Sequence, residues 1–143
     1  MPLPDPFPGL VLHYSYLWHD QYQRGLEEGS KDRPCVVVLA VTREDGDTVV
    51  TVAPVTHTPP RMAGEGVEIP AATKMRLGLD EGRSWIVVTG INRFRWPGVD
   101  LLPVPGKGGY DYGVLPPGLF RQVRDGIASW VRLRKLRTTP RSG

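Results

Sequence analysis

The sequence predicts a mainly β (α+β) domain that carries one short helix and one C-terminal amphipathic helix. Residues 35–41 and 48–55 are rich in β-branched side chains and flank an Asp45-Gly46 pair, which is the pattern of an antiparallel hairpin. The 17 Gly and 15 Pro among the 143 residues favour strands and turns over long helices. Apolar side chains within residues 119–133 recur at spacings of three and four, which indicates a helix with one buried face.

The chain before the hairpin is expected to contain one strand. Residues 1–8 alternate proline with other residues and form an extended lead-in. Residues 10–18 are dense in strand-forming side chains. Residues 19–32 turn polar and lack a helical period, so we expect a long loop of the kind that is often functional.

Short elements follow the hairpin. A loop over residues 58–66 leads to a short helix over residues 71–77 that stops at Gly78. The C-terminal helix begins after Pro116, where proline suits the first turn. The remaining strands are expected at residues 66–70, 83–89, 91–96 and 99–104, with a loop at residues 107–113 and a frayed tail at residues 138–143. Because neither a repeat nor a change in composition divides the chain, we expect a single domain over residues 1–143.

Composition limits the kinds of site that the chain can hold. Cys35 is the only cysteine and lies in an apolar run, and no Cys/His ligand spacing occurs, so neither a disulfide scaffold nor a metal site is expected. No cofactor is expected either. Because no stretch approaches the roughly 18 apolar residues of a membrane-spanning helix and no signal peptide is recognisable, we expect a soluble, cytoplasmic protein.

The net charge is +3, and the basic residues are concentrated near the C-terminus. They are Arg121, Arg124, Arg132, Arg134, Lys135, Arg137 and Arg141. This distribution suits a polyanion or an acidic partner protein, although a basic helix end is also commonly just solvated.

Several short strings occur in an order and spacing that are found together in one toxin family. They are Gly9 before the first strand, Arg33-Pro34 before the hairpin, Ala53-Pro54-Val55-Thr56 at its end, Val67-Glu68-Ile69 before the short helix, and Gly78 followed by Ser84. With these strings and its terminal helix, the chain resembles the MazF/PemK/Kid family of toxins from type II toxin–antitoxin systems over most of its length.

The resemblance implies a small SH3-like β-barrel that forms a homodimer with its active site at the dimer interface. It also implies metal-independent cleavage of single-stranded RNA at short sequences, which a cognate antitoxin blocks. Matched by position, Arg33 and Thr56 are the family's catalytic residues. One departure lies after the penultimate strand, where many members carry an acidic-Gln pair before a basic residue. Here residues 88–92 contain no acid and Arg93 follows, so the carboxylate that some members use is missing.

The candidate catalytic residues suit cleavage of RNA by its own 2′-hydroxyl, which needs a base, an acid and a cation. Arg33 offers a planar fork for phosphate oxygens, and Thr56 offers a hydroxyl donor. His57 offers an imidazole, the side-chain group most often used for proton transfer, and Glu28 can supply a base from the first loop. Each has a plainer alternative: a surface arginine, a strand-forming threonine, a structural histidine and a solvated glutamate.

Ser84, Arg93 and Trp18 are the candidate RNA contacts. Ser84 matches a family serine, and Trp18 can stack on an unpaired base, although core packing and dimer burial explain most aromatic residues more simply. For His13 and His19 we expect packing or surface roles.

Two functions of other classes compete with a ribonuclease. One is a non-enzymatic toxin of the same fold that poisons gyrase by binding it, and the other is an SH3-like RNA- or protein-binding module. The missing carboxylate favours the non-enzymatic toxin, whereas Arg33 and Thr56 favour the enzyme.

Overall fold

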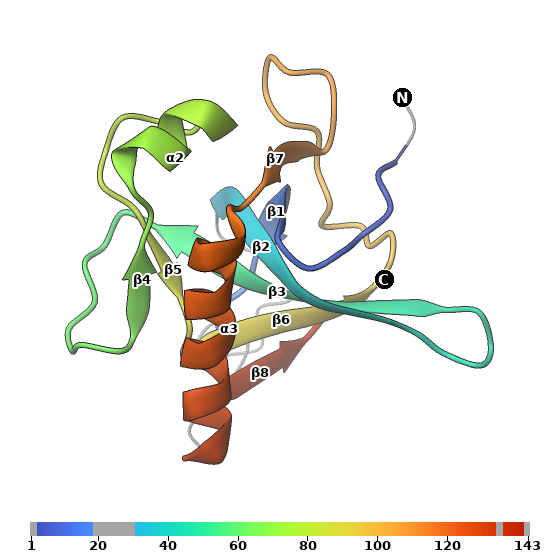
Figure 1. Cartoon of the computed structure of the whole chain (residues 1–143). Helices are drawn as coiled ribbons and strands as arrows, with labels where there is room; N and C mark the ends of the chain where they lie inside the picture. The colour runs from blue at the N-terminus through green and yellow to red at the C-terminus, as the bar shows by residue number, and fades with distance from the viewer. Residues whose placement is uncertain (1–2, 19–30, 134–135, 142–143) are drawn as a thin grey trace.

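The computed structural model describes residues 3–18, 31–133 and 136–141, whose strands form a curled sheet with two helices packed against it (Figure 1). The strands are β1 (Leu10–Tyr16), β2 (Lys31–Thr42), β3 (Thr48–Thr56), β4 (Gly66–Glu68), β5 (Trp85–Val87), β6 (Gly90–Arg95), β7 (Asp111–Val114) and β8 (Arg137–Pro140). The helices are α2 (Ala71–Leu77) and α3 (Pro117–Arg132). The predicted mainly β fold with a short helix and a C-terminal helix is therefore confirmed.

The hairpin of β2 and β3 forms the centre of the sheet, as predicted. Its strands pair antiparallel from Cys35–Pro54 to Thr42–Thr48, and the turn between them projects beyond the rest of the molecule (Figure 1). The order across the sheet is β4-β5-β3-β2-β1-β7, and β6 pairs with both β3 and β8. β2 begins at Lys31, earlier than predicted, because β1 runs beside it and supplies ladder partners for these polar residues.

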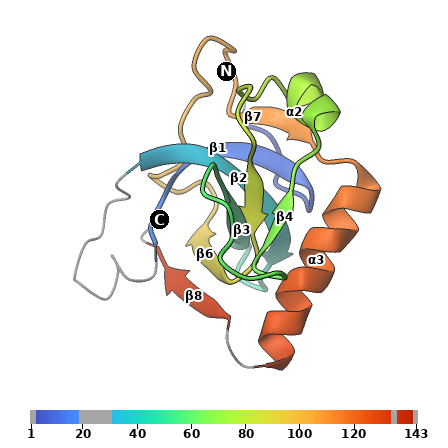
Figure 2. The ribbon, with the colours of Figure 1, turned by 90° about the vertical axis from the view of Figure 1, so that its left-hand side faces the viewer.

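Both faces of the central strands are buried. Val36 belongs to an apolar cluster between the sheet and α3, whereas Val37 belongs to a second cluster inside the curl. Because successive side chains of a strand point to opposite faces, burial on both faces accounts for the continuous apolar runs of β2 and β3. α3 runs along one side of the curled sheet (Figure 2). Gly126 permits its close approach, since a Cβ there would lie 3.2 Å from methyl carbons of Val88.

The two helices have the predicted ends. α2 ends at Gly78, whose φ of 71° places it in the left-handed region and turns the chain back toward the sheet. α3 begins at Pro117, where the missing N–H of proline costs no helical hydrogen bond. Within the described parts of the chain, neither helix is long and apolar enough to cross a membrane.

The prediction of a frayed tail at residues 138–143 is wrong for the residues that the structure describes. β8 pairs parallel with β6, and Thr139 is buried. Beyond the strand, Arg141 lies buried with its Nη2 2.8 Å from the Asp100 carboxylate, and its Nη1 donates to the Ser15 carbonyl at 3.2 Å. This ion pair between distant segments holds the tail in place, and no local pattern in a basic, polar tail could have indicated it.

Two predictions between β6 and α3 are also wrong. Residues 99–104 form no strand and contribute only an isolated bridge from Leu101 to Tyr14, because Pro103 interrupts the segment and proline cannot donate to a ladder. The segment 107–113, predicted as a loop, ends in β7. β7 forms because the outer edge of β1 is open and Val11 pairs with Gly113, whose φ of 121° suits glycine.

Candidate active site

A cleft of about 1240 Å³ opens where β1, β2 and β3 meet the segment between α2 and β5. Its walls include five of the residues predicted for the site: Trp18, Arg33, Thr56, His57 and Ser84. They come from separate parts of the sequence, and the antiparallel sheet brings them to one edge. Arg33 lies two residues before the Cys35–Pro54 pair on β2, and Thr56 lies two residues after it on β3.

Arg33 is a half-buried cation in the wall of the cleft. Its guanidinium carbon lies 5.0 Å from the centroid of the Trp18 ring, a cation–π contact that fixes its position. In the described parts of the chain no carboxylate pairs with it, and its buried Nε has no hydrogen-bond partner. Burial lowers the pKa of the Arg33 guanidinium, which nevertheless remains charged at neutral pH. A desolvated, unpaired cation facing a cleft is a binding site for an anion.

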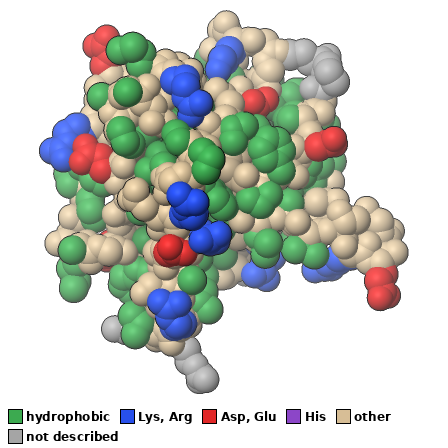
Figure 3. All heavy atoms as spheres, in the orientation of Figure 1, with side chains coloured by type: hydrophobic (Ala, Val, Ile, Leu, Met, Phe, Trp, Pro, Cys, Tyr) green, Lys and Arg blue, Asp and Glu red, His purple; other side chains and the backbone are tan. Residues whose placement is uncertain are grey.

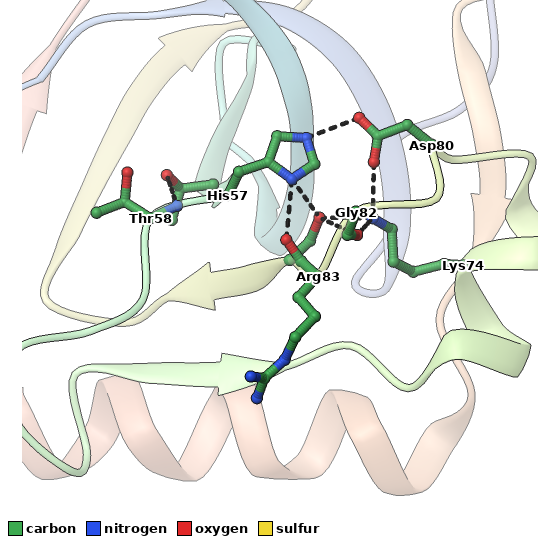
Figure 4. Close-up of polar contacts among 8 residues, drawn as sticks. His57, Thr58, Lys74, Asp80, Gly82 and Arg83 are labelled. Carbon is green, nitrogen blue, oxygen red and sulfur yellow. Dashed lines mark hydrogen bonds and ion pairs between the residues drawn. The ribbon is translucent and has the colours of Figure 1, made fainter.

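Thr56 ends β3 beside Arg33. Its Oγ1 accepts a hydrogen bond of 3.1 Å from the Thr58 backbone N–H, which fixes the hydroxyl oxygen (Figure 4). No acceptor for the hydroxyl hydrogen exists among the described residues, so this hydrogen can be donated to a molecule in the cleft.

His57 has both ring nitrogens occupied (Figure 4). Its Nε2 lies 2.7 Å from an Asp80 carboxylate oxygen, and its Nδ1 lies 2.9 Å from the Arg83 carbonyl oxygen. Because both partners can only accept, the two bonds form together when the ring carries two protons. In a neutral ring with hydrogen on Nε2, Nδ1 instead accepts from the Ser84 hydroxyl at 3.3 Å.

The buried Lys74 joins these groups into one network. Its ammonium donates to Asp80 and to the Ser84 hydroxyl, each at 2.7 Å, and to the Gly82 carbonyl. Partial burial alone would raise the pKa of the Asp80 carboxyl, but the hydrogen bonds and charges of Lys74 and His57 outweigh it and leave that pKa below its usual value. Lys74 therefore anchors Asp80, and Asp80 orients the imidazole of His57.

No sequence pattern pointed to Lys74 or Asp80. A lysine within a short helix is normally solvated, and an aspartate shortly after a helix-ending glycine is normally a turn residue. The turn at Gly78, where the N–H of Leu79 donates to the carbonyl of Lys74, brings Asp80 back over the lysine.

His13 lies in the same cleft, although we expected a packing or surface role for it. Its side chain is only 11% exposed, and its Nδ1 lies 2.9 Å from the Tyr112 hydroxyl. Its Nε2 is 3.9 Å from the Asp32 carboxylate, too far for a hydrogen bond. The pairing of β1 with β2 sets His13 opposite Pro34 and Tyr14 opposite Arg33, so the side chains of His13 and Arg33 point to opposite faces of the sheet.

The remaining predicted residues lie in different surroundings. Ser84 lines the cleft but is buried, with its hydroxyl bound by Lys74. Arg93 is exposed on β6 and does not line the cleft. Glu28 and His19 lie outside the described residues. Among the residues that are described, no three His, Cys, Asp or Glu side chains group as metal ligands would.

The basic residues near the C-terminus that the structure describes do not form one continuous patch. Arg121, Arg124 and Arg132 are exposed on α3, where Figure 3 shows basic side chains interspersed with apolar and acidic ones. Arg141 is buried against Asp100 and so cannot contribute to a surface patch. Arg134 and Lys135 lie outside the described residues.

Comparison with known proteins gives a match in structure but none in sequence. No family model matches the chain, and no curated protein does. Among solved structures, the chain is similar to an endoribonuclease in complex with its cognate antitoxin from a mycobacterial species, with a TM-score of 0.56 and 15% sequence identity. The match covers 90% of this chain and 97% of that chain. The two proteins therefore share a fold, and the fold implied by the sequence resemblance is confirmed.

Proposed function

We propose that the protein is the toxin of a type II toxin–antitoxin system and acts as a metal-independent endoribonuclease on single-stranded RNA. The observation that carries the proposal is Arg33, a half-buried cation that pairs with no carboxylate of the described residues and lies beside the Thr56 hydroxyl in an open cleft. The shared fold with an endoribonuclease supports the same assignment. The phosphodiester of RNA supplies the anion that the guanidinium lacks.

The reaction follows from the groups in the cleft. The 2′-hydroxyl oxygen attacks the adjacent phosphorus, the bond from phosphorus to the 5′-oxygen breaks, and a 2′,3′-cyclic phosphate and a free 5′-hydroxyl form. Arg33 binds the non-bridging phosphate oxygens through its fork of donors, and the Thr56 hydroxyl donates to one of them. Both contacts strengthen as negative charge gathers on these oxygens in the transition state.

We assign protonation of the leaving 5′-oxygen to His57. Each ring nitrogen faces an acceptor, so the ring can carry a proton on both nitrogens, and this is the form that can give up a proton. The side chain is 53% exposed, so the ring can exchange the Asp80 carboxylate for the leaving oxygen without a rearrangement of the core. Asp80 and Lys74 hold the imidazole beside Thr56 until RNA binds.

The partners follow from the same assignment. We propose that the protein works in the cytoplasm as a homodimer, that single-stranded RNA enters the cleft, and that a cognate antitoxin inhibits it. The mycobacterial endoribonuclease was solved with such an antitoxin.

The test is cleavage of a long, mostly unstructured RNA by the purified protein in EDTA. Wild type is expected to cut at a defined short sequence and leave cyclic-phosphate ends, while Arg33→Ala and Thr56→Ala lose about 100-fold or more of the rate. Arg43→Ala is the matched control, because it removes an exposed arginine outside the cleft and should leave the rate unchanged. If folded wild type leaves a broad panel of RNA sequences intact, the ribonuclease assignment is wrong and gyrase binding becomes the next test.

A further inference from the structure

Arg83 is held in one position at the rim of the cleft, although its side chain is 72% exposed. Its Nε and Nη2 donate to the two carboxylate oxygens of Glu68, each at 2.8 Å. Its guanidinium carbon lies over the ring of Trp85, 5.0 Å from the centroid. A bidentate carboxylate at its edge and an aromatic ring below it together fix the plane of this exposed guanidinium.

The pairing of three strands places these residues in line with the proposed catalytic hydroxyl. On β5, Trp85 pairs with Thr56 of β3 on one side and with Glu68 of β4 on the other. Residues directly opposite each other in an antiparallel ladder share a face of the sheet, so the three side chains form a row on one face. Arg33 lies on this face too, because the β2–β3 ladder, continued by two residues, sets it opposite Thr56. Trp85, which lies under Arg83, is thus one strand spacing, about 4.8 Å, from Thr56.

The contacts of Arg83 leave a flat surface for a ligand and not a charged fork. The carboxylate of Glu68 occupies two of its donor nitrogens and balances its charge, which makes it a poor partner for a phosphate. Hydrogen bonds from Arg83 also keep the pKa of the Glu68 carboxyl below its usual value, so the pair is charged at neutral pH.

The open surface belongs to the arginine and not to the aromatic ring beneath it. Trp85 lines the cleft but is buried, so its ring supports Arg83 and offers little surface of its own. The guanidinium face that is turned away from Trp85 is open to solvent. Unpaired nucleobases stack on arginine planes of this kind in RNA-binding proteins, so the ligand class that fits is a nucleobase.

We propose that Arg83, held by Trp85 and Glu68, is a stacking platform for a nucleobase next to the scissile phosphate of single-stranded RNA. The inference rests on the proposed ribonuclease function and adds a base-binding subsite to it. With the phosphate on Arg33 and Thr56, an adjoining nucleotide extends along the row and its base stacks on Arg83. The side chain of Arg83 points away from His57, whereas its carbonyl oxygen lies 2.9 Å from the imidazole Nδ1 (Figure 4).

A stacked base makes the same contact before and during the reaction, so the platform should act on RNA affinity and not on the chemical step. The test compares wild type with Arg83→Met and Arg83→Lys on a short RNA that contains the cleaved sequence. Both replacements remove the flat guanidinium, but lysine keeps the charge. We expect both to bind an uncleavable 2′-deoxy analogue about fivefold to 50-fold more weakly. The single-turnover rate at saturating enzyme should change less than about threefold.

The matched control is Arg43→Met, which removes an exposed arginine near the hairpin turn, outside the cleft, and should bind RNA as wild type does. A series of RNAs then separates stacking on a base from contact with a phosphate. Each nucleotide around the cut is replaced in turn by an abasic residue, which keeps the backbone. We expect the difference between wild type and Arg83→Met to disappear when the abasic residue replaces one of the two nucleotides that the scissile phosphate joins. The slope of log affinity against log salt should stay the same in Arg83→Met, whereas a lost phosphate contact would reduce it by about 0.7.

The outcomes distinguish the platform from the enzyme. If wild type cuts RNA while Arg83→Met binds as tightly as wild type, or while its loss persists on every abasic substrate, the platform is wrong and the ribonuclease function stands. If Arg83→Lys keeps the wild-type affinity, the charge and not the flat face binds RNA, and the platform is again wrong. If wild type cuts no RNA, the ribonuclease function falls. The platform then stands only if Arg83→Met binds an unstructured RNA more weakly than wild type and Arg43→Met do.

Discussion

Replacing Lys74 by methionine should destabilise the protein more than any change to its exposed partner Asp80. Only 6% of the Lys74 side chain is exposed, and its ammonium satisfies a buried serine hydroxyl and the Gly82 carbonyl as well as the Asp80 carboxylate. In the variant, the serine hydroxyl and the Gly82 carbonyl lose their hydrogen-bond donor. Each loss costs about 1–3 kcal/mol where water cannot take the place of the lysine. The Asp80 side chain is 63% exposed and can be hydrated, so its ion pair contributes at most about 1 kcal/mol.

The expected loss for Lys74→Met is therefore about 2–4 kcal/mol in the free energy of unfolding. For a domain of this size, that corresponds to a fall in Tm of roughly 7–13 °C. Asp80→Asn, the matched control, should lose less than about 1 kcal/mol. Urea denaturation followed by circular dichroism at pH 7 measures both variants. The reasoning is refuted if Lys74→Met unfolds at the wild-type urea concentration, or if Asp80→Asn is the more damaging change.

The remaining predictions concern the ion pairs and the cleft. Because the pKa of Asp80 is lowered on folding, its stabilisation is complete at neutral pH and is lost as the pH falls through that pKa; the urea midpoints of wild type and Asp80→Asn should therefore converge in acid. Arg141→Met should cost about 3 kcal/mol or more, because it removes the buried cation of the ion pair with the largely buried Asp100 carboxylate, and a variant with an unchanged urea midpoint would contradict this. Thr56→Ser should keep most of the single-turnover cleavage rate, whereas Thr56→Val should lose about 100-fold; equal rates would exclude a role for the hydroxyl. Arg33→Lys should lose about tenfold or more in the same assay, because lysine lacks the fork that binds two phosphate oxygens, and a fully active lysine variant would argue against bidentate binding.

Most of the fold follows from local patterns. The hairpin of β2 and β3, the short helix that stops at Gly78 and the helix that begins at Pro117 were all predicted close to their observed positions. Each is specified by its own residues, through β-branched runs around an Asp-Gly turn, a left-handed glycine or a proline at a helix start. The hairpin prediction alone also brought Arg33 close to Thr56.

Two of the errors fall where a distant partner decides the structure. β7 lies in a glycine-rich segment and forms a strand because it pairs with the open edge of β1. β8 forms beside β6 in a C-terminal segment that was predicted to be frayed. The expected strand at residues 99–104 fails for a local reason, because Pro103 cannot complete a ladder. The formation of β7 and β8, by contrast, depends on a distant strand and not on the segment's own residues alone.

The sequence by itself determined the mainly β architecture and the juxtaposition of Arg33 with Thr56, because register within a hairpin is set locally by its turn. Only the tertiary structure decided which other groups share the cleft: the Lys74–Asp80 pair that holds His57, and His13 on the far side of β2. Their positions depend on how α2 and β1 pack against the hairpin, and such contacts join residues far apart in the chain. Side chains that the sequence suggests are solvated or structural therefore line the cleft in the folded protein.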